Sequence, residues 1–513
     1  MDQYSKEAQG GVRLQLPICD KQQIIEVASD FSLPDYQPQI KRLLRVRATV
    51  LPADTYIGTP SVELSGRIEY GILYTGEDGA LYCTSQSGEY RYSFPFEMPP
   101  ELDLNEGVIC DVDSTCDSVI ARVAAPRKIS VKCRLHSRVR LLGGGVYDQT
   151  LPARESAAEC LFGRALSGRR FVGIGEAMQL GDEVLCDKQD GEVRVISAEG
   201  EVFVSEATAG SGVVNCRGEV CLKLILCREG DDALPTVQLR RIPFVQAVAT
   251  DGVEVNCDAC ADGTCSDIRV TVEEGRILCE MAVILRTRAQ RNEEIQYIRD
   301  VYSTCAECEA SYREESFSRA LRSVNGNFSL NHTLPLSEAG IRPDARVVDV
   351  CATPTVTAME CEHGKYRLLG RCRCQLILSD GEEMSAQEIE LPFRYECEGS
   401  GEDVSDYDAS VSVISCRARV DGERVSVDAE LAVMLATRGK QECRMLAAAS
   451  FGESVKNTAG TYTICYPTRE DTLWSVAKRY HRAVDDVVRD NHLSEASMAD
   501  ASDSLAGVRY LLV

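Results

Sequence analysis

Residues 62–74 read VELSGRIEYGILY, and this stretch alternates between apolar and charged positions. Even-numbered positions carry apolar residues or glycine, whereas Glu63, Arg67 and Glu69 fall on odd positions. A period of two is typical of a β-strand with one buried face. The glycine in its middle, Gly66, indicates a bend, a bulge or a close approach that a side chain would obstruct.

The same pattern occurs three times in the chain. It returns as VNCRGEVCLKLIL over residues 214–226 and as YRLLGRCRCQLIL over residues 366–378. The central glycines Gly66, Gly218 and Gly370 are separated by 152 residues in both intervals. A repeat of this length is too long for a solenoid unit, so we expect whole domains in tandem.

An apolar-Pro-Phe sequence follows each of these strands, at residues 94–96, 242–244 and 391–393. Proline cannot donate to a strand ladder, so these sequences indicate strand starts or sheet edges. Short strands with regular turns and little helical periodicity predict a β-sandwich for each copy. The expected fold class is therefore mainly β, with three tandem sandwich-like repeats followed by a small βααβ domain.

The repeats and the stretches between them predict the domain boundaries. The β units are expected at 37–150, 160–292 and 325–440, after an N-terminal segment at 1–36. A linker is expected at 441–460, where the chain turns small and polar, and a C-terminal domain at 461–513. Between the β units, we expect a short helix around 155–166 and a polar helical piece within 293–325.

The composition restricts the class of protein and of partner. The 513 residues are 44% hydrophobic and 27% charged, which is typical of globular protein, and the formal net charge is -24. An acidic chain repels nucleic acid and anionic membranes, so neither is an expected partner. Apolar runs are too short to span a bilayer, and the polar start of the chain shows no secretory signal. These features favour a soluble protein inside the cell.

The chain contains 24 cysteines. Without an export signal, we expect reduced thiols that act as small hydrophobic core residues. Metal binding and oxidative cross-linking are the alternatives. The metal candidates are Cys257 and Cys260 with Cys265 nearby, while the second pair, Cys305 and Cys308, could chelate only across a turn.

Near the C-terminus, the apolar period changes from two to three and four. Leu473, Val476, Ala477 and Tyr480 form one helical stripe, and Asp471 precedes it as the expected helix cap. A second stripe covers 484–491, and short β-like pieces flank both helices. The order β-α-α-β is therefore expected within about fifty residues.

This segment resembles the LysM family over residues 461–513. The resemblance rests on Tyr462-Thr463-Ile464, on DTLWSVAKRY at 471–480, on Asn491-His492-Leu493 and on LAGVRYL at 505–511. The sequence departs from the family pattern at Glu470, His481 and Ala506. LysM domains bind N-acetylglucosamine glycans through two loops that are both altered here. The resemblance implies that a partner or a glycan would contact the following residues: Asp471, Thr472, Leu473, Trp474, Asn491 and Gly507.

Tandem β units followed by one LysM-like domain resemble the SPOCS-domain plus LysM proteins of spore-forming Firmicutes. Leu33-Pro34-Asp35-Tyr36 and Asp300-Val301-Tyr302-Ser303 support this resemblance. It implies a cytoplasmic scaffold for spore coat assembly, acting in the mother cell at the forespore surface. The implied partner is a SpoIVA-like coat morphogenetic ATPase. The alternative is a protein that binds the peptidoglycan of the spore cortex or cell wall.

The sequence carries no recognisable catalytic constellation. Its five histidines are isolated, and it lacks a P-loop, a His-Glu-x-x-His motif and a Gly-x-Ser-x-Gly motif. We therefore expect no enzyme activity and no cofactor. The single tryptophan, Trp474, has two interpretations: it covers the small C-terminal core, or it is partly exposed and anchors a partner.

Overall fold

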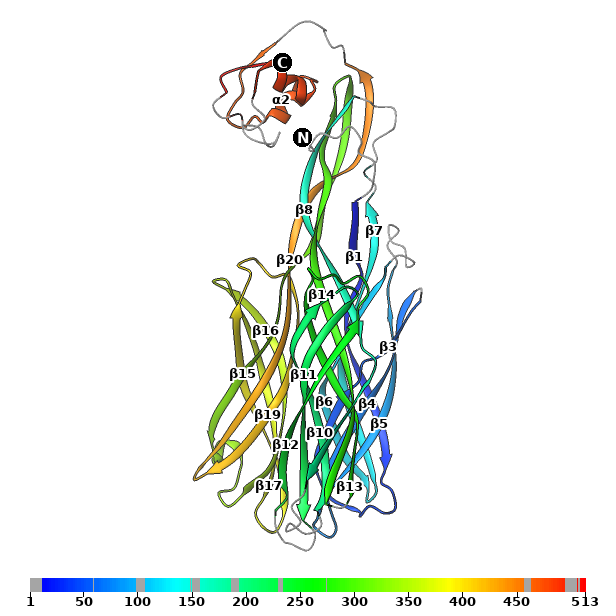
Figure 1. The fold of residues 1–513 in the computed structure, drawn as a ribbon, viewed down its shortest axis with the longest axis vertical. Helices are drawn as coiled ribbons and strands as arrows, with labels where there is room; N and C mark the ends of the chain where they lie inside the picture. Colours follow the sequence, from blue (N-terminus) through cyan, green and yellow to red (C-terminus); the bar gives the residue numbers. More distant parts are fainter. Residues whose placement is uncertain are drawn as a thin grey trace.

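The computed structural model describes residues 12–58, 60–97, 107–147, 149, 157–185, 193–228, 234–273, 275–455, 463–493, 505 and 508–513. Its architecture is mainly β, as expected, and every strand pair is antiparallel. Three sandwiches form an elongated body, a narrower stalk leaves one end of it, and a small module lies at the tip of the stalk (Figure 1).

The first sandwich contains seven strands. They are β1 (Val12–Ser32), β2 (Ile40–Val50), β3 (Asp54–Ile57), β4 (Ser61–Gly76), β5 (Leu81–Pro95), β6 (Ile109–Ala125) and β7 (Lys128–Tyr147). One sheet has the order β1-β7-β6, and the other joins β2, β3 and β5 to β4. The predicted N-terminal segment 1–36 is therefore wrong from residue 12 onward, because β1 pairs along its length with β7.

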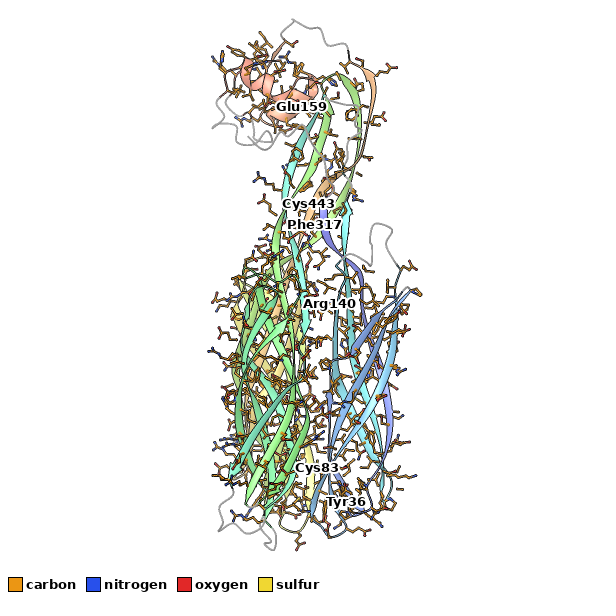
Figure 2. The ribbon with its side chains drawn as sticks, turned by 45° about the vertical axis from the view of Figure 1, so that its right-hand side comes forward. Tyr36, Cys83, Arg140, Glu159, Phe317 and Cys443 are labelled. Atoms are coloured by element: carbon orange, nitrogen blue, oxygen red, sulfur yellow. The ribbon has the colours of Figure 1, made fainter. Side chains whose placement is uncertain are left out.

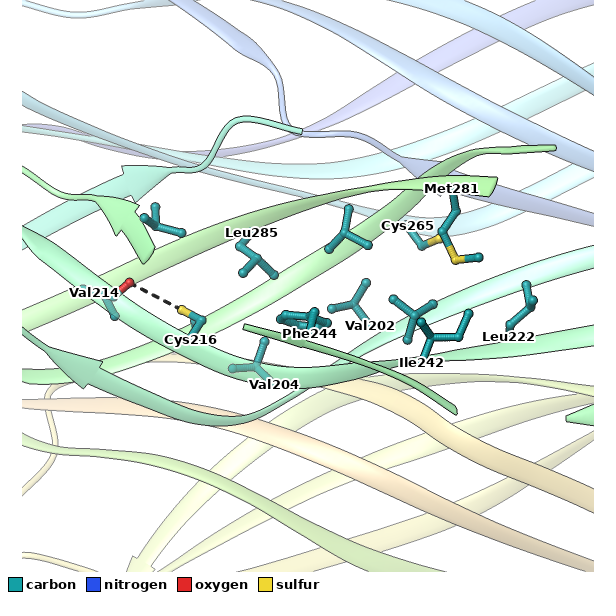
Figure 3. Close-up of a cluster of buried hydrophobic side chains, with 14 of the residues drawn as sticks. Val202, Val204, Val214, Cys216, Leu222, Ile242, Phe244, Cys265, Met281 and Leu285 are labelled. Atoms are coloured by element: carbon teal, nitrogen blue, oxygen red, sulfur yellow. Dashed lines mark hydrogen bonds between the residues drawn. The ribbon is translucent and has the colours of Figure 1, made fainter. Parts of the chain in front are cut away.

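The second sandwich repeats this topology. Its strands are β8 (Ala158–Ile174), β9 (Met178–Leu185), β10 (Val193–Ala209), β11 (Val213–Arg228), β12 (Thr236–Ala249), β13 (Asp258–Glu273) and β14 (Arg276–Ser303). The sheets have the orders β10-β11-β12 and β13-β14-β8, with β9 also on β14. Figure 3 shows its core, where Cys216, Phe244 and Leu285 come from both sheets.

The third sandwich and the C-terminal module complete the chain. The sandwich contains β15 (Ala306–Pro335), α1 (Leu336–Ala339), β16 (Arg346–Glu362), β17 (Lys365–Ser379), β18 (Met384–Glu398), β19 (Asp406–Asp421) and β20 (Arg424–Ser454). Its sheets have the orders β16-β17-β18 and β15-β20-β19. The module contains β21 (Ile464–Cys465), α2 (Leu473–Arg479), α3 (Val484–Asp490) and β22 (Leu511–Leu512), in the expected β-α-α-β order.

The repeated glycines lie in the middle strand of the equivalent sheet in each sandwich, opposite an aromatic residue of the next strand. Gly66 pairs with Tyr90, Gly218 with Phe244 and Gly370 with Phe393. A Cβ at Gly370 would lie 2.1 Å from the Phe393 ring, and one at Gly66 would lie 2.4 Å from the Tyr90 ring. The close approach predicted for these glycines is therefore present, because the ring of the neighbouring strand folds over each of them.

The three sandwiches meet at one buried apolar cluster. Each of the equivalent strands β2, β10 and β16 contains a β-bulge that turns one apolar residue out of its own sandwich. These residues and a second equivalent set, again separated by 152 residues, form one buried cluster. The two sets are Leu44, Ile196 and Val348 with Leu73, Ile225 and Ile377, and Leu81 of the first sandwich joins them. Residues that face outward from one sandwich are thus core residues of the assembled body.

Ion pairs on buried side chains join the sandwiches beside this apolar cluster. Arg45 of the first sandwich binds Glu199 of the second at 2.6 Å and Asp349 of the third at 2.5 Å. Lys223 reaches both carboxylates at 3.1 Å, and Arg47 also contacts Glu199. The side chains of Arg45 and Asp349 are each 2% exposed, so these charges have lost their contacts with water. The ion pairs of this network compensate for that loss between the three domains.

A second ionic network joins the sandwiches at the end nearest the stalk, where Arg140 lies (Figure 2). Each sandwich contributes one buried arginine from its long central strand: Arg140, Arg288 and Arg438. Asp111 accepts from both Arg140 and Arg288, and Asp408 accepts from Arg140 and Arg438. Burial alone would raise the pKa of Asp111, but Arg288 and Arg140 outweigh it and hold that pKa well below its usual range.

The stalk is built on two antiparallel strand pairs, β8 with β14 and β15 with β20, and β1 packs against its base (Figure 1). Its interior contains side chains from both strand pairs, including Cys160, Ile298, Val301 and Leu446. Gln149 links them: its side chain donates to the Leu446 carbonyl at 3.2 Å and accepts from the Ile298 N–H at 2.9 Å.

The stalk contradicts several predictions made for the stretches between domains. The helix expected at 155–166 is strand β8 from Ala158, and the helical piece expected within 293–325 belongs to β14 and β15. The linker expected at 441–460 is strand β20 up to Ser454, and residues 456–460 lie outside the described residues. Small residues such as Ala449 were mistaken for linker composition, although they pack inside the stalk.

Candidate interaction site on the C-terminal module

The C-terminal module has its own small core between the helices and the two-stranded sheet. Leu473, Val476, Ala477 and Val487 are buried there with Cys465. Helix α2 begins at Thr472, whose Oγ1 accepts from the Ser475 N–H at 3.1 Å, while the Ser475 hydroxyl accepts from the Thr472 N–H at 2.8 Å. This capping box satisfies two N–H groups that would otherwise lack partners.

Asp471 is not the helix cap that the sequence predicts. Its carboxylate instead accepts from the N–H and hydroxyl of Thr468 and from Arg479. The backbone hydrogen bond from Thr468 is the main reason that the pKa of Asp471 is lowered. Asp471 is 6% exposed, so it fixes the loop before α2 and offers little surface to a partner.

Asn491 and Gly507 are two further predicted contact residues. The Asn491 side chain donates to the carbonyls of Val487 and Leu512 and accepts from the Leu512 N–H at 2.7 Å. It therefore joins the end of α3 to β22 and is a structural residue. Gly507 lies outside the described residues.

Trp474 docks the module onto the stalk. Its side chain is only 4% exposed, so the expectation of a partly exposed partner anchor is wrong. The indole Nε1 donates to Asp300 Oδ2 at 2.8 Å, and the ring meets Tyr302 edge-on with centroids 4.8 Å apart. Leu161 of β8 belongs to the same apolar cluster. Trp474 thus serves both the module core and its attachment.

Asp300 is the polar centre of this docking contact. Besides Trp474, it accepts from Lys478 Nζ at 2.7 and 2.9 Å and from the Tyr312 hydroxyl. Burial by itself raises the pKa of Asp300, but the hydrogen bonds from Lys478, Tyr312 and Trp474 outweigh burial and lower it. The charged carboxylate of Asp300 in β14 therefore holds helix α2 of the module through the side chains of Trp474 and Lys478.

The turn after α2 adds further contacts to the stalk. His481 has a positive φ of 51°, so this turn residue lies in the left-handed region. Its Nδ1 lies 2.9 Å from the Ser303 carbonyl oxygen, and the Tyr302 hydroxyl donates to the Arg482 carbonyl at 2.7 Å. Asp300-Val301-Tyr302-Ser303 is thus the segment of the stalk that receives the module.

An apolar face of the module remains exposed. Ile464, Tyr466 and Tyr510 are 54%, 74% and 56% exposed. Ile464 pairs with Leu512 and Cys465 with Leu511, so Tyr466 directly follows β21 and Tyr510 directly precedes the antiparallel β22 at the same end of this two-stranded sheet. Cys465 between them points into the core, so Ile464 and Tyr466 share the outer face. We call these three residues the aromatic face. The alternation around Cys465 is the sequence signal that could have identified it.

The cysteine candidates for a metal site do not converge. Cys260 packs against Met434 and Ala436 of the third sandwich, whereas Cys257 and Cys265 belong to the core of the second. Across the described ranges, no group of three or more His, Cys, Asp or Glu side chains is arranged to hold a metal ion. Within the same ranges, no helix has the length and apolar character required to cross a bilayer.

The chain was compared with known proteins in three ways. No protein-family model matches it, and neither a curated protein nor a solved structure matches it. The functional argument therefore rests on the residues and the geometry described above.

Proposed function

We propose that this protein is a non-enzymatic adaptor that presents its C-terminal module to a partner protein. The observation that carries this proposal is the division of the module into two sides. One side is buried against the stalk through Trp474, and the other side carries the exposed aromatic face. Tyrosine is enriched among the residues that contribute most to protein interfaces, and its ring loses little conformational entropy on binding.

The three sandwiches serve in this proposal as a rigid spacer. Two buried ionic networks and an apolar cluster join them, and continuous strands run from the body into the stalk. A partner that binds the module is therefore held at a fixed distance from whatever contacts the body.

The resemblance to SPOCS-domain plus LysM proteins suggests which assembly this adaptor serves. On that basis, the partner is a SpoIVA-like coat ATPase, and the protein acts in the cytoplasm of the mother cell at the forespore surface. Acidic composition is compatible with a protein partner and disfavours nucleic acid.

Co-purification of the ATPase with the full chain tests this proposal. Replacing both Tyr466 and Tyr510 with serine should weaken binding by roughly thirtyfold or more, because interface aromatics of this kind contribute about 2 kcal/mol or more. The matched control is Tyr36→Ser, since Tyr36 is 85% exposed at the opposite end of the body (Figure 2). Unchanged binding by the double variant would refute the aromatic face as the docking surface.

A second candidate function is binding of peptidoglycan glycan. Two exposed tyrosines at the same end of a two-stranded sheet are a suitable surface for the apolar faces of sugar rings. Muropeptide pull-down with the same variants separates the two functions. Glycan binding that is lost in the double variant, with no ATPase co-purification from the unmodified chain, would favour this alternative.

A further inference from the structure

Two cysteines of the first sandwich lie in direct contact. Cys116 is on β6 and Cys133 is on the adjacent strand β7, and their sulfur atoms are 3.6 Å apart. A β-bulge after Cys116, between Cys116 and Ser118, brings them together although they are not directly opposed. Closing an S–S bond to about 2.05 Å requires the sulfurs to move by only ~1.5 Å, which is within reach of side-chain rotation.

The two thiols differ in access. Cys133 is 1% exposed, whereas Cys116 is partly exposed and lines a cavity of about 350 Å³ where the three sandwiches meet. They also differ in ease of ionisation. The hydrogen bond from Cys133 lowers the pKa of Cys116, while the contact with Cys116 and burial raise the pKa of Cys133. A partly exposed thiol on a cavity wall, in contact with a second thiol that can resolve it, is the arrangement found in peroxide-sensing cysteine pairs.

We propose that Cys116 and Cys133 form a peroxide-responsive pair that closes into an intramolecular disulfide within the first sandwich. This proposal is independent of the adaptor function. The oxidant is a hydroperoxide small enough to enter the cavity.

The reaction has two steps. The Cys116 thiolate attacks one oxygen of hydrogen peroxide, so that the O–O bond breaks, an S–O bond forms, and hydroxide leaves and takes up the proton released by Cys116. The Cys133 sulfur then attacks the Cys116 sulfur, an S–S bond replaces the S–O bond, and the departing hydroxide takes the Cys133 proton. Two thiols and one peroxide yield one disulfide and two waters, with sulfur oxidised and peroxide oxygen reduced.

The third sandwich supplies a matched control pair. Cys372 and Cys374 have sulfurs 3.8 Å apart, but both side chains are 0% exposed. Similar sulfur contact without access predicts no reaction at this pair.

The test uses the full chain, fully reduced and then treated with hydrogen peroxide near one equivalent. After denaturation, alkylation and digestion without reductant, we expect one cross-linked peptide that joins Cys116 to Cys133 and disappears on reduction. Alkylation of Cys372 and Cys374 should be unchanged. Equal loss at both pairs, or oxidation of exposed Cys305 and Cys361 with Cys116 still fully alkylated, would overturn the proposal.

A variant separates the two steps. In Cys133→Val, the sulfenic acid on Cys116 has no thiol to resolve it and should be trapped by dimedone at least tenfold more than in the unmodified chain. Equal trapping in both proteins would mean that Cys133 does not resolve the intermediate. A melting curve checks that the variant folds, and if it does not fold, the peptide map of the unmodified chain decides alone.

Discussion

Replacing Asp300 with alanine should release the C-terminal module from the stalk. The change removes the acceptor of Trp474 Nε1 and of Lys478 Nζ. A hydrogen bond to a charged group is worth about 1.5–3 kcal/mol. The Lys478 side chain is 40% exposed, so we count its ion pair at no more than ~1 kcal/mol. The docking free energy should therefore fall by roughly 2–4 kcal/mol.

The sequence provides its own reporter for this change. Trp474 is the only tryptophan, and it is 4% exposed in the docked state. Undocking should shift its fluorescence to longer wavelength and increase quenching by acrylamide. The matched control is Asp486→Ala, which removes the exposed ion pair to Arg489 on the other helix of the module. If Asp300→Ala shows the same emission and quenching as this control, the contact does not hold the module in place.

Four further predictions concern the body, the module and pH. Gly370→Ala should destabilise the protein to urea by about 1–3 kcal/mol because its Cβ would overlap a neighbouring ring, whereas Gly71→Ala, with no atom within 4 Å, should be near neutral. Arg45→Met should cost about 3–5 kcal/mol because it leaves two carboxylates without their central arginine. Ala483→Ser should raise the free energy of unfolding of the C-terminal module by about 1 kcal/mol, since helix α3 lacks a side-chain cap. The unfolding of the module is followed by the fluorescence of Trp474. Because the pKa of Asp300 is lowered in the docked state, its contribution to docking should be fully present above the ordinary aspartate pKa of ~3.9. This contribution should be lost as the pH falls through the lower pKa of the docked state, and the emission of Trp474 should then shift to longer wavelength.

The sandwich architecture could be predicted from the sequence because its signal is local. The alternation around Gly66, Gly218 and Gly370 specifies strands, and their even positions are the buried face. The docking contact could not be predicted in this way. Trp474 and Asp300 are 174 residues apart, and nothing in the module's own helical pattern shows that the indole faces a strand of the second sandwich.

The stalk was missed because its strands are rich in small and charged residues. In β15, Cys308, Ala310 and Tyr312 repeat at a period of two and pack inward, but the polar residues that alternate with them, Glu307, Glu309 and Ser311, suggested a polar helical piece. Pairing with β20 over nearly its full length stabilises this segment, and such pairing is not visible within the segment itself.

The contact between the three sandwiches corresponds to one feature of the sequence that the alternation within a strand does not explain. In the three repeated strands, odd positions carry most of the charges, yet Leu73, Ile225 and Ile377 are odd and apolar. A strand in an isolated sandwich would expose these side chains to water, at a cost of about 1.5–3 kcal/mol each relative to burial. Their recurrence at intervals of 152 residues indicates a shared covering surface, and among the described residues these side chains cover one another in one cluster between the three sandwiches. Residues that break a repeat's internal pattern at equivalent places thus identify contacts between the copies.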